Sequence, residues 1–439
     1  MINYKKGSIT FILTVLTLGA MAQSTANNSS PYSQFGLGTP NSFLLPQTSA
    51  MGGIATAINK INGFNTVNVV NPASYSFINY TTIDIGAYGE VSKLKQLNVS
   101  GGQSNGNFRL NHFNFAAPVS RRSALSFGLV PYTTLGYNYK QTAANFGTGL
   151  PSDTSAVNYI YSGDGGLSKA YFGYGFGIGR HISFGGNASY IFGNLRKFRS
   201  TEIPSLYGVI NSRSERSNSI SGFNFDFGTQ VNFDLDETRH VVFGYSGSTA
   251  NSLRSKVTNV VSQYFNTDGA EGSALDTISN QVINDGKIKL PLIHHFGVSF
   301  QQDGKFLIGA DYSMGKWSQL TIPGESVSLQ DSKSLSVGGQ YTPNANALHS
   351  YLALIDYRLG FHTDQTYIRL SNTDIKQYGV TFGLGLPLAR NGSAFHKINF
   401  SAEYGQRGTY NNNLIKENYF NFRLGFTLND VWFQKYRFD

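Results

Sequence analysis

The chain of 439 residues contains no cysteine, and this excludes disulfide bonds, thiolate metal sites, a cysteine nucleophile and a lipid anchor on an N-terminal cysteine. Charged residues are scarce, at 13% of the chain against about 25% in typical proteins. After the first 22 residues no apolar run reaches 18 residues, so no transmembrane helix is expected. The low charge argues against soluble globular domains, and the lack of long apolar runs argues against a helical membrane protein.

Aromatic residues are abundant instead, with 33 Phe and 26 Tyr beside only 2 Trp. The 49 glycines also exceed the usual share of about 7%. The net charge is +9, but Lys and Arg are scattered without a basic run, which favours turns and loops that meet anionic lipid headgroups over nucleic-acid binding.

In the predicted strand 219–235, apolar and polar residues alternate from Phe223 to Leu235. Phe223, Phe225 and Phe227 share one face, whereas Asn224 and Asp226 lie on the other. A period of two indicates a strand, and its apolar face is long enough for the ~9–11 residues that cross a bilayer. Such strands persist in lipid only in a closed barrel, which pairs every backbone group.

The first 22 residues have the pattern of a secretory signal peptide. Lys5 and Lys6 precede an apolar stretch that ends near Gly19, and Ala20-Met21-Ala22 forms a small-x-small cleavage site. The mature protein is therefore expected to start at Gln23, outside the cytoplasm.

Residues 23–80 are rich in Asn, Ser, Gly and Pro and show no sustained alternation. They hold too many apolar residues for a free tail, so they are predicted to fold inside the barrel as a plug. The barrel is predicted over residues 81–429, with a periplasmic tail at 430–439.

The sequence thus predicts an all-β fold, a transmembrane antiparallel β-barrel of fourteen strands with an N-terminal plug in the lumen. Short and long connections alternate along the chain, as they do in bacterial barrels, and an all-β secreted sandwich fits less well. The predicted long outer loops are 140–167, 199–218 and 255–287. The expected strands are 81–96, 106–119, 123–139, 168–179, 181–198, 219–235, 240–254, 288–301, 305–320, 332–342, 350–362, 375–387, 395–408 and 415–429.

Two short motifs resemble the signature of FadL-type barrels, the long-chain fatty-acid transporter family of outer membranes. They are the segment from Ala50 to Ala57, which contains Met51-Gly52-Gly53, and Asn71-Pro72-Ala73. The resemblance implies fourteen strands, a hatch inside the lumen and a location in the bacterial outer membrane. Between the motifs, Asn59-Lys60-Ile61-Asn62-Gly63 replaces the acidic, alanine-rich segment usual in the family.

The C-terminal segment Gly425–Lys435 resembles the ends of FadL-like proteins such as PorV-type subunits of the type IX secretion system. That resemblance implies docking of secreted proteins rather than lipid transport. Trp432 and Phe433 are expected at the inner headgroup level, where aromatic residues are favoured.

The motif residues have two interpretations. Gly52 and Gly53 either let the backbone bend beside a ligand path or permit positive φ in a tight turn, and the second is favoured. Asn71 and Pro72 are expected to cap and kink the chain before the first strand. They are more readily architectural than ligand-binding.

Four charged residues are predicted to face the lumen, Asp226, Asp356, Arg358 and Arg423. An arginine there could bind a substrate carboxylate, but the favoured interpretation is that these charges bond to the plug and hold it.

Gly173, Gly175 and Gly177 mark a possible wall kink, which in FadL-type barrels opens a sideways exit into the membrane. The same glycines could instead make room for the plug. The eight histidines lack metal-ligand spacing, and no catalytic constellation stands out, so neither enzyme activity nor a metal or cofactor is expected.

Two functions remain open. The first is passive uptake of a hydrophobic ligand through the plugged barrel, and the second is a non-transporting subunit of an outer-membrane complex for type IX secretion or barrel assembly. The second would dock partner proteins through the outer loops. Expected surroundings are outer-membrane lipids and lipopolysaccharide.

Overall fold

The computed structural model describes residues 30–41, 43–97, 101–150, 154–204, 208–267, 270–325, 329–388 and 394–432. The predicted signal peptide lies outside these residues. Among the described residues, no helix is both long enough and apolar enough to cross a membrane.

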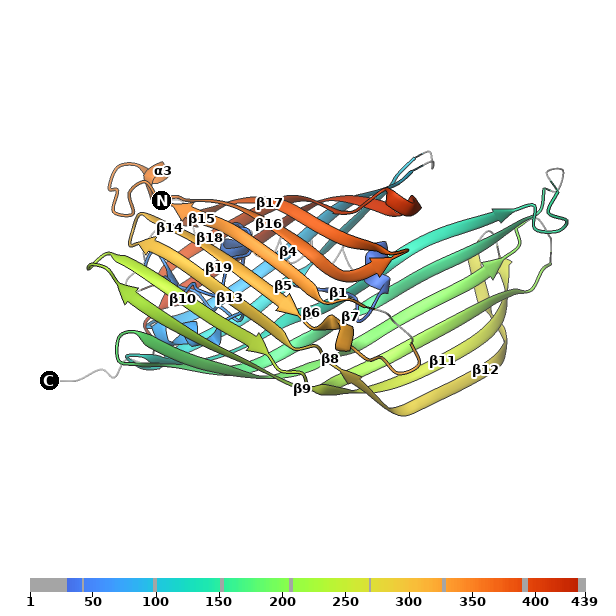
Figure 1. Cartoon of the computed structure of the whole chain (residues 1–439), viewed down its shortest axis with the longest axis horizontal. Coiled ribbons are helices and arrows are strands. Elements are labelled where there is room, and N and C mark those ends of the chain that lie inside the picture. Colours follow the sequence, from blue (N-terminus) through green and yellow to red (C-terminus); the bar gives the residue numbers. More distant parts are fainter. Residues whose placement is uncertain are drawn as a thin grey trace, which may run out of the picture.

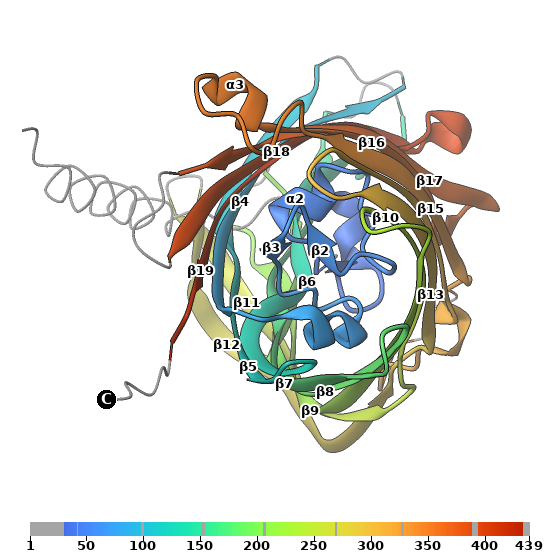
Figure 2. The ribbon, with the colours of Figure 1, turned by 90° about the vertical axis from the view of Figure 1, so that its left-hand side faces the viewer.

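Long antiparallel strands form one continuous wall around a lumen (Figures 1 and 2). The strands are β4 (Thr81–Gln96), β5 (Gln103–Ser120), β6 (Ser123–Ala144), β7 (Ala156–Ile178), β8 (Ile182–Glu202), β9 (Asn211–Asp234), β10 (Arg239–Ser248), β11 (Ser252–Thr267), β12 (Ala270–Lys289), β13 (Ile293–Gln302), β14 (Phe306–Gly315), β15 (Ser332–Tyr341), β16 (Asp356–Leu370), β17 (Thr373–Pro387), β18 (Phe395–Gly408) and β19 (Ile415–Asp430).

The wall has fourteen strands, because β10 and β11 together form one wall strand and β12 and β13 together form the next. Both β10 and β11 pair with β9, one below the other, and are separated only by a break at 249–251. Likewise β13 pairs with β10 and β12 with β11. The wall closes where β19 pairs with β4 along its whole length, from Thr81 opposite Asp430 to Gln96 opposite Ile415. The predicted closed barrel of fourteen antiparallel strands is confirmed.

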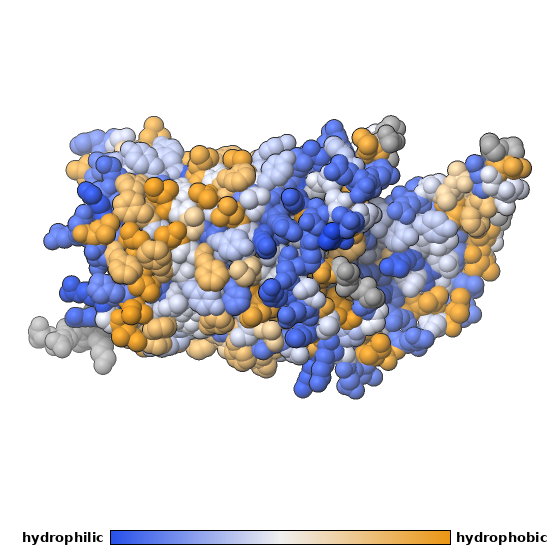
Figure 3. Space-filling model, in the orientation of Figure 1, coloured by the Kyte–Doolittle hydropathy of each residue, from blue (hydrophilic) through white to orange (hydrophobic). Residues whose placement is uncertain are grey.

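Alternation along each strand sorts the side chains as predicted. On β9, Phe223 is 62% exposed and Phe225 is 50% exposed on the outer face, whereas Asn224 and Gln230 are fully buried on the inner face. On the face that Figure 3 shows, apolar residues gather over the left-hand half of the barrel, here called the apolar belt. Exposed apolar residues in a continuous belt, with paired backbone behind them, are what a bilayer requires of a barrel.

Residues 30–80, here called the inner segment, lie inside the wall (Figure 2). Their short elements are η2 (Pro31–Gln34), β1 (Thr39–Pro40), α2 (Pro46–Ser49), β2 (Lys60–Ile61), β3 (Phe64–Asn65) and η3 (Pro72–Phe77). Pro31, Pro46 and Pro72 each occupy the first turn of their helix, where the missing N–H removes no hydrogen bond.

The base of the barrel is the end where β4 starts and β19 ends, and the opposite end is the top. The prediction of long loops at the top was wrong, because most residues of the predicted loops belong to strands that continue upward. Among the described residues of 140–167, 199–218 and 255–287, only 145–150, 154–155, 203–204 and 208–210 lie outside strands. Isolated Gly and Ser obscure the alternation there, although the backbone remains paired.

The prolonged strands form a top extension, which comprises 130–144, 156–167, 193–202, 211–221, 252–267 and 270–289. It projects beyond the other strands, toward the right of Figure 1. In Figure 3 a polar zone separates it from the apolar belt.

Two strand boundaries also need correction. The strand predicted at 350–362 starts only at Asp356, because Tyr351–Leu354 forms the short helix α3 at the base. Tyr351 and Ala353 therefore do not lie on the wall. The strand predicted at 305–320 ends at Gly315 and is followed by η4 (Trp317–Gln319). A further short helix, η5 (Asn411–Asn413), connects β18 to β19.

The wall has a seam between β5 and β6. These strands pair only from Phe113 opposite Leu129 to Ser120 opposite Ser123. Above that, β1 of the inner segment pairs with β6, so that Thr39 lies opposite Thr134. The guanidinium of Arg109 on β5 donates to Asn41 and Thr134, which links β5 to this inserted piece. The inner segment thus supplies backbone pairing that the wall itself lacks.

A substitution at Phe225 tests whether this side of β9 faces lipid. Replacing it with lysine places a charge in the apolar belt, and we expect the free energy of unfolding in lipid vesicles to fall by about 2–4 kcal/mol. Phe225→Leu, the apolar control, should change it far less. Equal stability of the two variants in denaturant titrations would contradict the assignment of this face to lipid.

Candidate functional site

The inner segment makes backbone contact with the wall where wall residues lack side chains. A Cβ atom at Gly360 on β16 would overlap the backbone nitrogen of Gly52, and one at Gly338 on β15 would overlap the carbonyl of Met51. Glycine at these wall positions therefore allows the turn at 51–53 to lie directly on the sheet.

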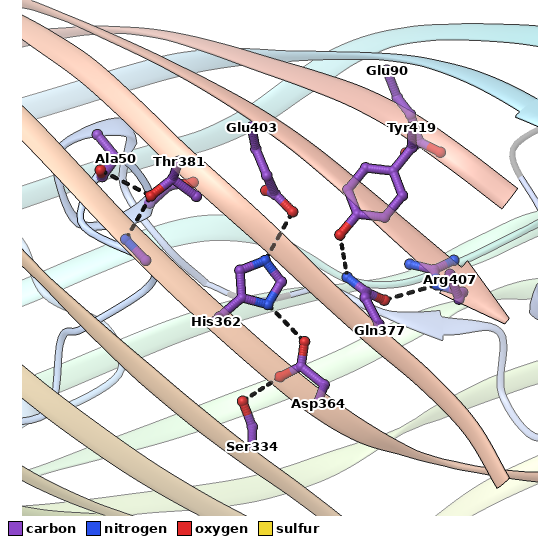
Figure 4. A network of polar contacts seen from close by, with 12 residues as sticks. Ala50, Glu90, Ser334, His362, Asp364, Gln377, Thr381, Glu403, Arg407 and Tyr419 are labelled. Atoms are coloured by element: carbon purple, nitrogen blue, oxygen red, sulfur yellow. Dashed lines mark hydrogen bonds and ion pairs between the residues drawn. The ribbon is translucent and has the colours of Figure 1, made fainter.

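Gly52 and Gly53 both have positive φ, at 73° and 94°. This conformation favours glycine, and a Cβ at Gly52 would also meet the carbonyl oxygen of Phe361 at 2.7 Å. The Gly52 N–H donates to Oγ1 of Thr381 at 2.8 Å, and this hydroxyl donates to the Ala50 carbonyl at 3.0 Å (Figure 4). The turn is held by the wall, and among the described atoms both glycines contact protein rather than a cavity.

Asp311 on β14 binds the next part of the inner segment. Its Oδ2 accepts hydrogen bonds from the backbone N–H groups of Ala55 and Thr56, each at 2.7 Å. A carboxylate that receives two N–H donors in a buried site forms strong, charge-assisted hydrogen bonds.

Asn71, Pro72 and Ala73 form the start of η3. The side chain of Asn71 accepts from the Ala73 N–H at 3.1 Å and donates to the Thr56 carbonyl at 2.7 Å. Asn71 is therefore the N-cap of η3 and also joins two parts of the inner segment. These contacts match the architectural interpretation.

The pairing of β7 is unbroken at Gly173, Gly175 and Gly177, the positions of the possible wall kink. Residues 168–178 of β7 pair with β8 without a register shift, and 168–176 pair equally regularly with β6. A Cβ at Gly175 would instead lie 2.6 Å from the Pro72 carbonyl oxygen, so this glycine makes room for η3. The interruption in the wall is at the β5–β6 seam.

Asp356 is the centre of a buried charged cluster. Its carboxylate binds Nη2 of Arg358 at 2.9 Å and Nζ of Lys397 at 2.7 Å, and it also accepts from Nδ2 of Asn62 at 3.0 Å. The two remaining Arg358 nitrogens donate to Gln340 and Asn399 on the wall. Each nitrogen of Arg358 thus has a protein partner, and the cluster binds the inner segment to the wall through Asn62.

Arg423 belongs to a second network, part of which Figure 4 shows. Its Nη1 donates to Oγ of Ser49 in the inner segment and lies 3.4 Å from Oε2 of Glu403. The imidazole of His362 bridges Glu403 at 3.0 Å and Asp364 at 2.8 Å. The predicted lumenal arginine therefore contacts both the wall and the inner segment.

Asp226 contacts the wall rather than the inner segment. It pairs with Nζ of Lys169 at 2.5 Å and accepts from Oγ of Ser248 at 2.9 Å. Lys169 in turn lies 4.7 Å from the ring centroid of Phe43, a cation–π contact with the inner segment.

Apolar packing fills the space between these polar networks. Met51, Ile54, Ile58 and Ile61 pack with Leu307 of the wall. Val67, Val69, Tyr75 and Ile78 pack against β5–β7, and Tyr32 and Leu37 belong to a larger cluster under the top. The lumen is thus a protein core as much as a polar cavity.

Two small cavities lie in the described part of the barrel, each with about 10 Å³ of space, room for roughly one water molecule. One is lined by Leu37 and Ile322 near the top, and the other by Phe64, Arg358 and Lys397 near the base. The described residues also contain no group of His, Asp and Glu that could hold a metal ion.

Trp432 follows β19 at the base. It is 41% exposed, its Nε1 donates to Asp430 at 3.1 Å, and its ring lies 6.1 Å from that of Phe115 on the outer face. This place suits the expected headgroup level. Phe433 lies outside the described residues.

Sequence reasoning missed the anchoring roles of Asp311, Thr381, Lys397 and Glu403. The alternation did place Asp311 on an inner face, but it could not show which part of the inner segment would lie opposite. The inward wall glycines, such as Gly338 and Gly360, were the available signal for close backbone contact.

A family model described as BamG matches residues 1–439, so the chain belongs to the BamG family. A search of curated proteins found no relative.

Solved structures share the fold at low sequence identity. The toluene transporter TodX of Pseudomonas putida is 14% identical and has a TM-score of 0.56, with 89% of this chain and 99% of that chain covered. A FadL homologue from Pseudomonas aeruginosa is 13% identical with a TM-score of 0.55, covering 91% and 100%. The toluene transporter TbuX of Ralstonia pickettii is 14% identical with a TM-score of 0.53, covering 88% and 98%. The likeness to FadL-type barrels is confirmed, and the protein is an outer-membrane β-barrel.

Gly360→Ala tests the contact between the inner segment and the wall. The added methyl overlaps the backbone of Gly52, so we expect the free energy of unfolding to fall by about 1–3 kcal/mol. In the matched control Gly186→Ala, the Cβ meets only the Asp226 carbonyl oxygen, at 3.5 Å. Thermal unfolding in detergent compares the two. A control that is destabilised as much as Gly360→Ala would contradict the contact.

Asp356→Ala tests the charged cluster. It leaves Arg358 and Lys397 buried without their carboxylate, and we expect a loss of about 3–5 kcal/mol in denaturant unfolding. Asp285→Ala, at an exposed position on β12, is the control and should stay within about 0.5 kcal/mol of the parent. If both variants had the parent's stability, the cluster would not hold the lumen together.

Proposed function

We propose that the protein is a non-transporting subunit of an outer-membrane protein complex for secretion or barrel assembly, and that its barrel is a closed scaffold that docks partner proteins. The observation that carries this proposal is the attachment of the inner segment inside the lumen. In the described part, hydrogen bonds, a buried charged cluster and apolar packing bind the inner segment to the wall, and two cavities beside it have room for about one water each.

A ligand path would require the inner segment to leave its position. That movement would break the Asp311 bonds to Ala55 and Thr56 and the Asn62 bond to Asp356, and it would expose Met51 and Ile54. Removing partners from buried charges and opening an apolar core together oppose movement by several kcal/mol. In this proposal, residues 23–80 form a permanent plug that supports the wall from inside.

The top extension supports docking. It projects past the apolar belt, so its exposed apolar side chains do not face hydrocarbon (Figure 3). On β12, Leu275 and Ile278 are 55% and 59% exposed. Exposed aliphatic residues beyond the membrane are typical of protein interaction sites.

Orientation follows from the barrel's architecture. Both ends of the wall lie at the base, which in bacterial barrels faces the periplasm, so the top extension lies outside the cell. We further infer that residues 1–22 direct export and are removed. The partners would then meet this protein at the cell surface, with lipopolysaccharide and other outer-membrane lipids around the belt.

Passive uptake of a hydrophobic compound is the second candidate. It is favoured by the fold shared with the toluene transporters TodX and TbuX and by the β5–β6 seam, where a displaced β1 would leave the wall unpaired. It needs a mobile inner segment, whereas docking does not.

A disulfide between the inner segment and the wall separates the two candidates. Ser76 on η3 donates to Ser183 on β8 with an Oγ–Oγ distance of 2.9 Å, and the chain has no other cysteine. In Ser76→Cys/Ser183→Cys, we expect the oxidised protein to retain stoichiometric partners on purification from native membranes in mild detergent, at the same yield as the reduced protein.

Each single cysteine variant is a control. Toluene uptake into cells is measured in parallel, because a transporter would lose uptake on oxidation and regain it on reduction. Redox-dependent uptake, or a protein that purifies from native membranes without a partner, would overturn the docking proposal.

A further inference from the structure

Strand β12 has one paired and one free edge. One edge pairs with β11, from Lys289 opposite Ser252 upward. Among the described residues, no strand pairs with the other edge, and only an isolated bridge from Lys289 to Thr321 lies at its foot. In the membrane the corresponding place is taken by β14, which pairs with β13. Because β14 ends at Gly315, the top extension continues past its neighbour and leaves β12 as an edge (Figure 1).

The described loop covers only the lower end of this edge. Pro323 lies close to Gly286, where a Cβ would meet its Cγ at 2.9 Å. Above this, all described residues from Ser273 to Asp285 except Ser279 are exposed. These 13 residues span about 40 Å of strand, along which the outward backbone N–H and C=O groups have no strand partner in the described part.

Edge strands exposed to water are usually protected by proline, lysine or bulges, because a free strand edge pairs readily with another chain. Residues 273–285 contain no proline, lysine or arginine. Register shifts on the β11 side leave Leu275 and Ile278 without a Cα partner, but Ser279–Ile283 pairs with β11 residue by residue. A regular stretch with a free edge is therefore available beside two exposed aliphatic residues.

The side chains of this edge define a partner's chemistry. Leu275, Ile278, Val282 and Ile283 are 41–59% exposed, above the lipid belt. The only charges between 273 and 285 are Asp276 and Asp285, so this stretch of β12 is acidic on a chain with a net charge of +9. A paired strand would place aliphatic residues against the apolar positions and a Lys or Arg opposite the aspartates.

We propose that the free edge of β12 binds an extended segment of another outer-membrane protein, which adds a strand to the top extension. The segment is aliphatic and basic, and main-chain hydrogen bonds hold it in a fixed register. This proposal rests on the docking function above and names the surface that performs it.

Cysteine scanning tests the register, and the cysteine-free chain needs no prior changes. Single cysteines from Ser279→Cys to Ile283→Cys are labelled on intact cells with a benzophenone maleimide, irradiated, and mapped by mass spectrometry after purification of the complex. Strand addition predicts cross-links to one continuous partner segment. When the cysteine is moved two residues along β12, the cross-linked partner residue should also shift by two.

The other outcomes are distinct. Cross-links to one partner without this stepwise register, or to a second copy of this chain, would overturn strand addition while leaving the docking function intact. Cross-links to lipopolysaccharide alone would also overturn it. If the intact complex contained no stoichiometric partner, the docking function itself would fail.

Charge substitution gives an independent measurement. The double variant Ile278→Lys/Val282→Lys introduces lysines, which natural edge strands use to prevent pairing. We expect the recovery of the mapped partner to fall about tenfold, which corresponds to a loss of about 1.4 kcal/mol in binding free energy. Leu150→Lys is the matched control, since Leu150 is also 59% exposed but lies between β6 and β7. Unchanged recovery in the double variant, with normal assembly in the membrane, would contradict the proposal.

Discussion

Close backbone contact between the inner segment and the wall is the feature on which the rest of the structure depends. A barrel of fourteen strands encloses more space than its own inward side chains fill, so something else must satisfy its buried polar groups. Glycines at inward wall positions let the chain of residues 51–57 and 71–73 lie directly on the sheet. Asp311, Thr381 and Asp356 then bind the backbone and side chains that this contact brings into reach.

The same contact explains why a shared fold does not imply a shared activity. The toluene transporters and this chain have the same architecture at about 14% identity, which shows the fold alone. Here the candidate lumenal arginines have protein partners, since each Arg358 nitrogen binds a wall residue and Nη1 of Arg423 binds Ser49 and Glu403. Of these candidate charges, Asp356 and Arg423 bind the inner segment directly, through Asn62 and Ser49.

The sequence predicted the barrel well, because alternation is a local property that each strand records by itself. Phe223–Phe227 identified the lipid face, and the fourteen strands were placed in the correct order. The top extension was missed because outward positions there, such as Asn194, Arg196 and Lys256, are polar, so the contrast between an apolar and a polar face is lost. Contacts across the lumen were missed for another reason. No local pattern tells which inner residue Asp311 faces, nor that the wall interruption lies between β5 and β6 rather than at Gly175.

Hydrogen exchange in the full protein tests the central claim most directly. In lipid nanodiscs, the amides of Gly52, Ala55 and Thr56 are donors to the wall, so peptides covering residues 50–60 should exchange as slowly as the paired strands β16 and β17. Peptides from the turn at 371–372 provide the fast reference. Exchange of residues 50–60 at the rate of that turn would contradict a sealed scaffold, because the inner segment would then leave the wall readily.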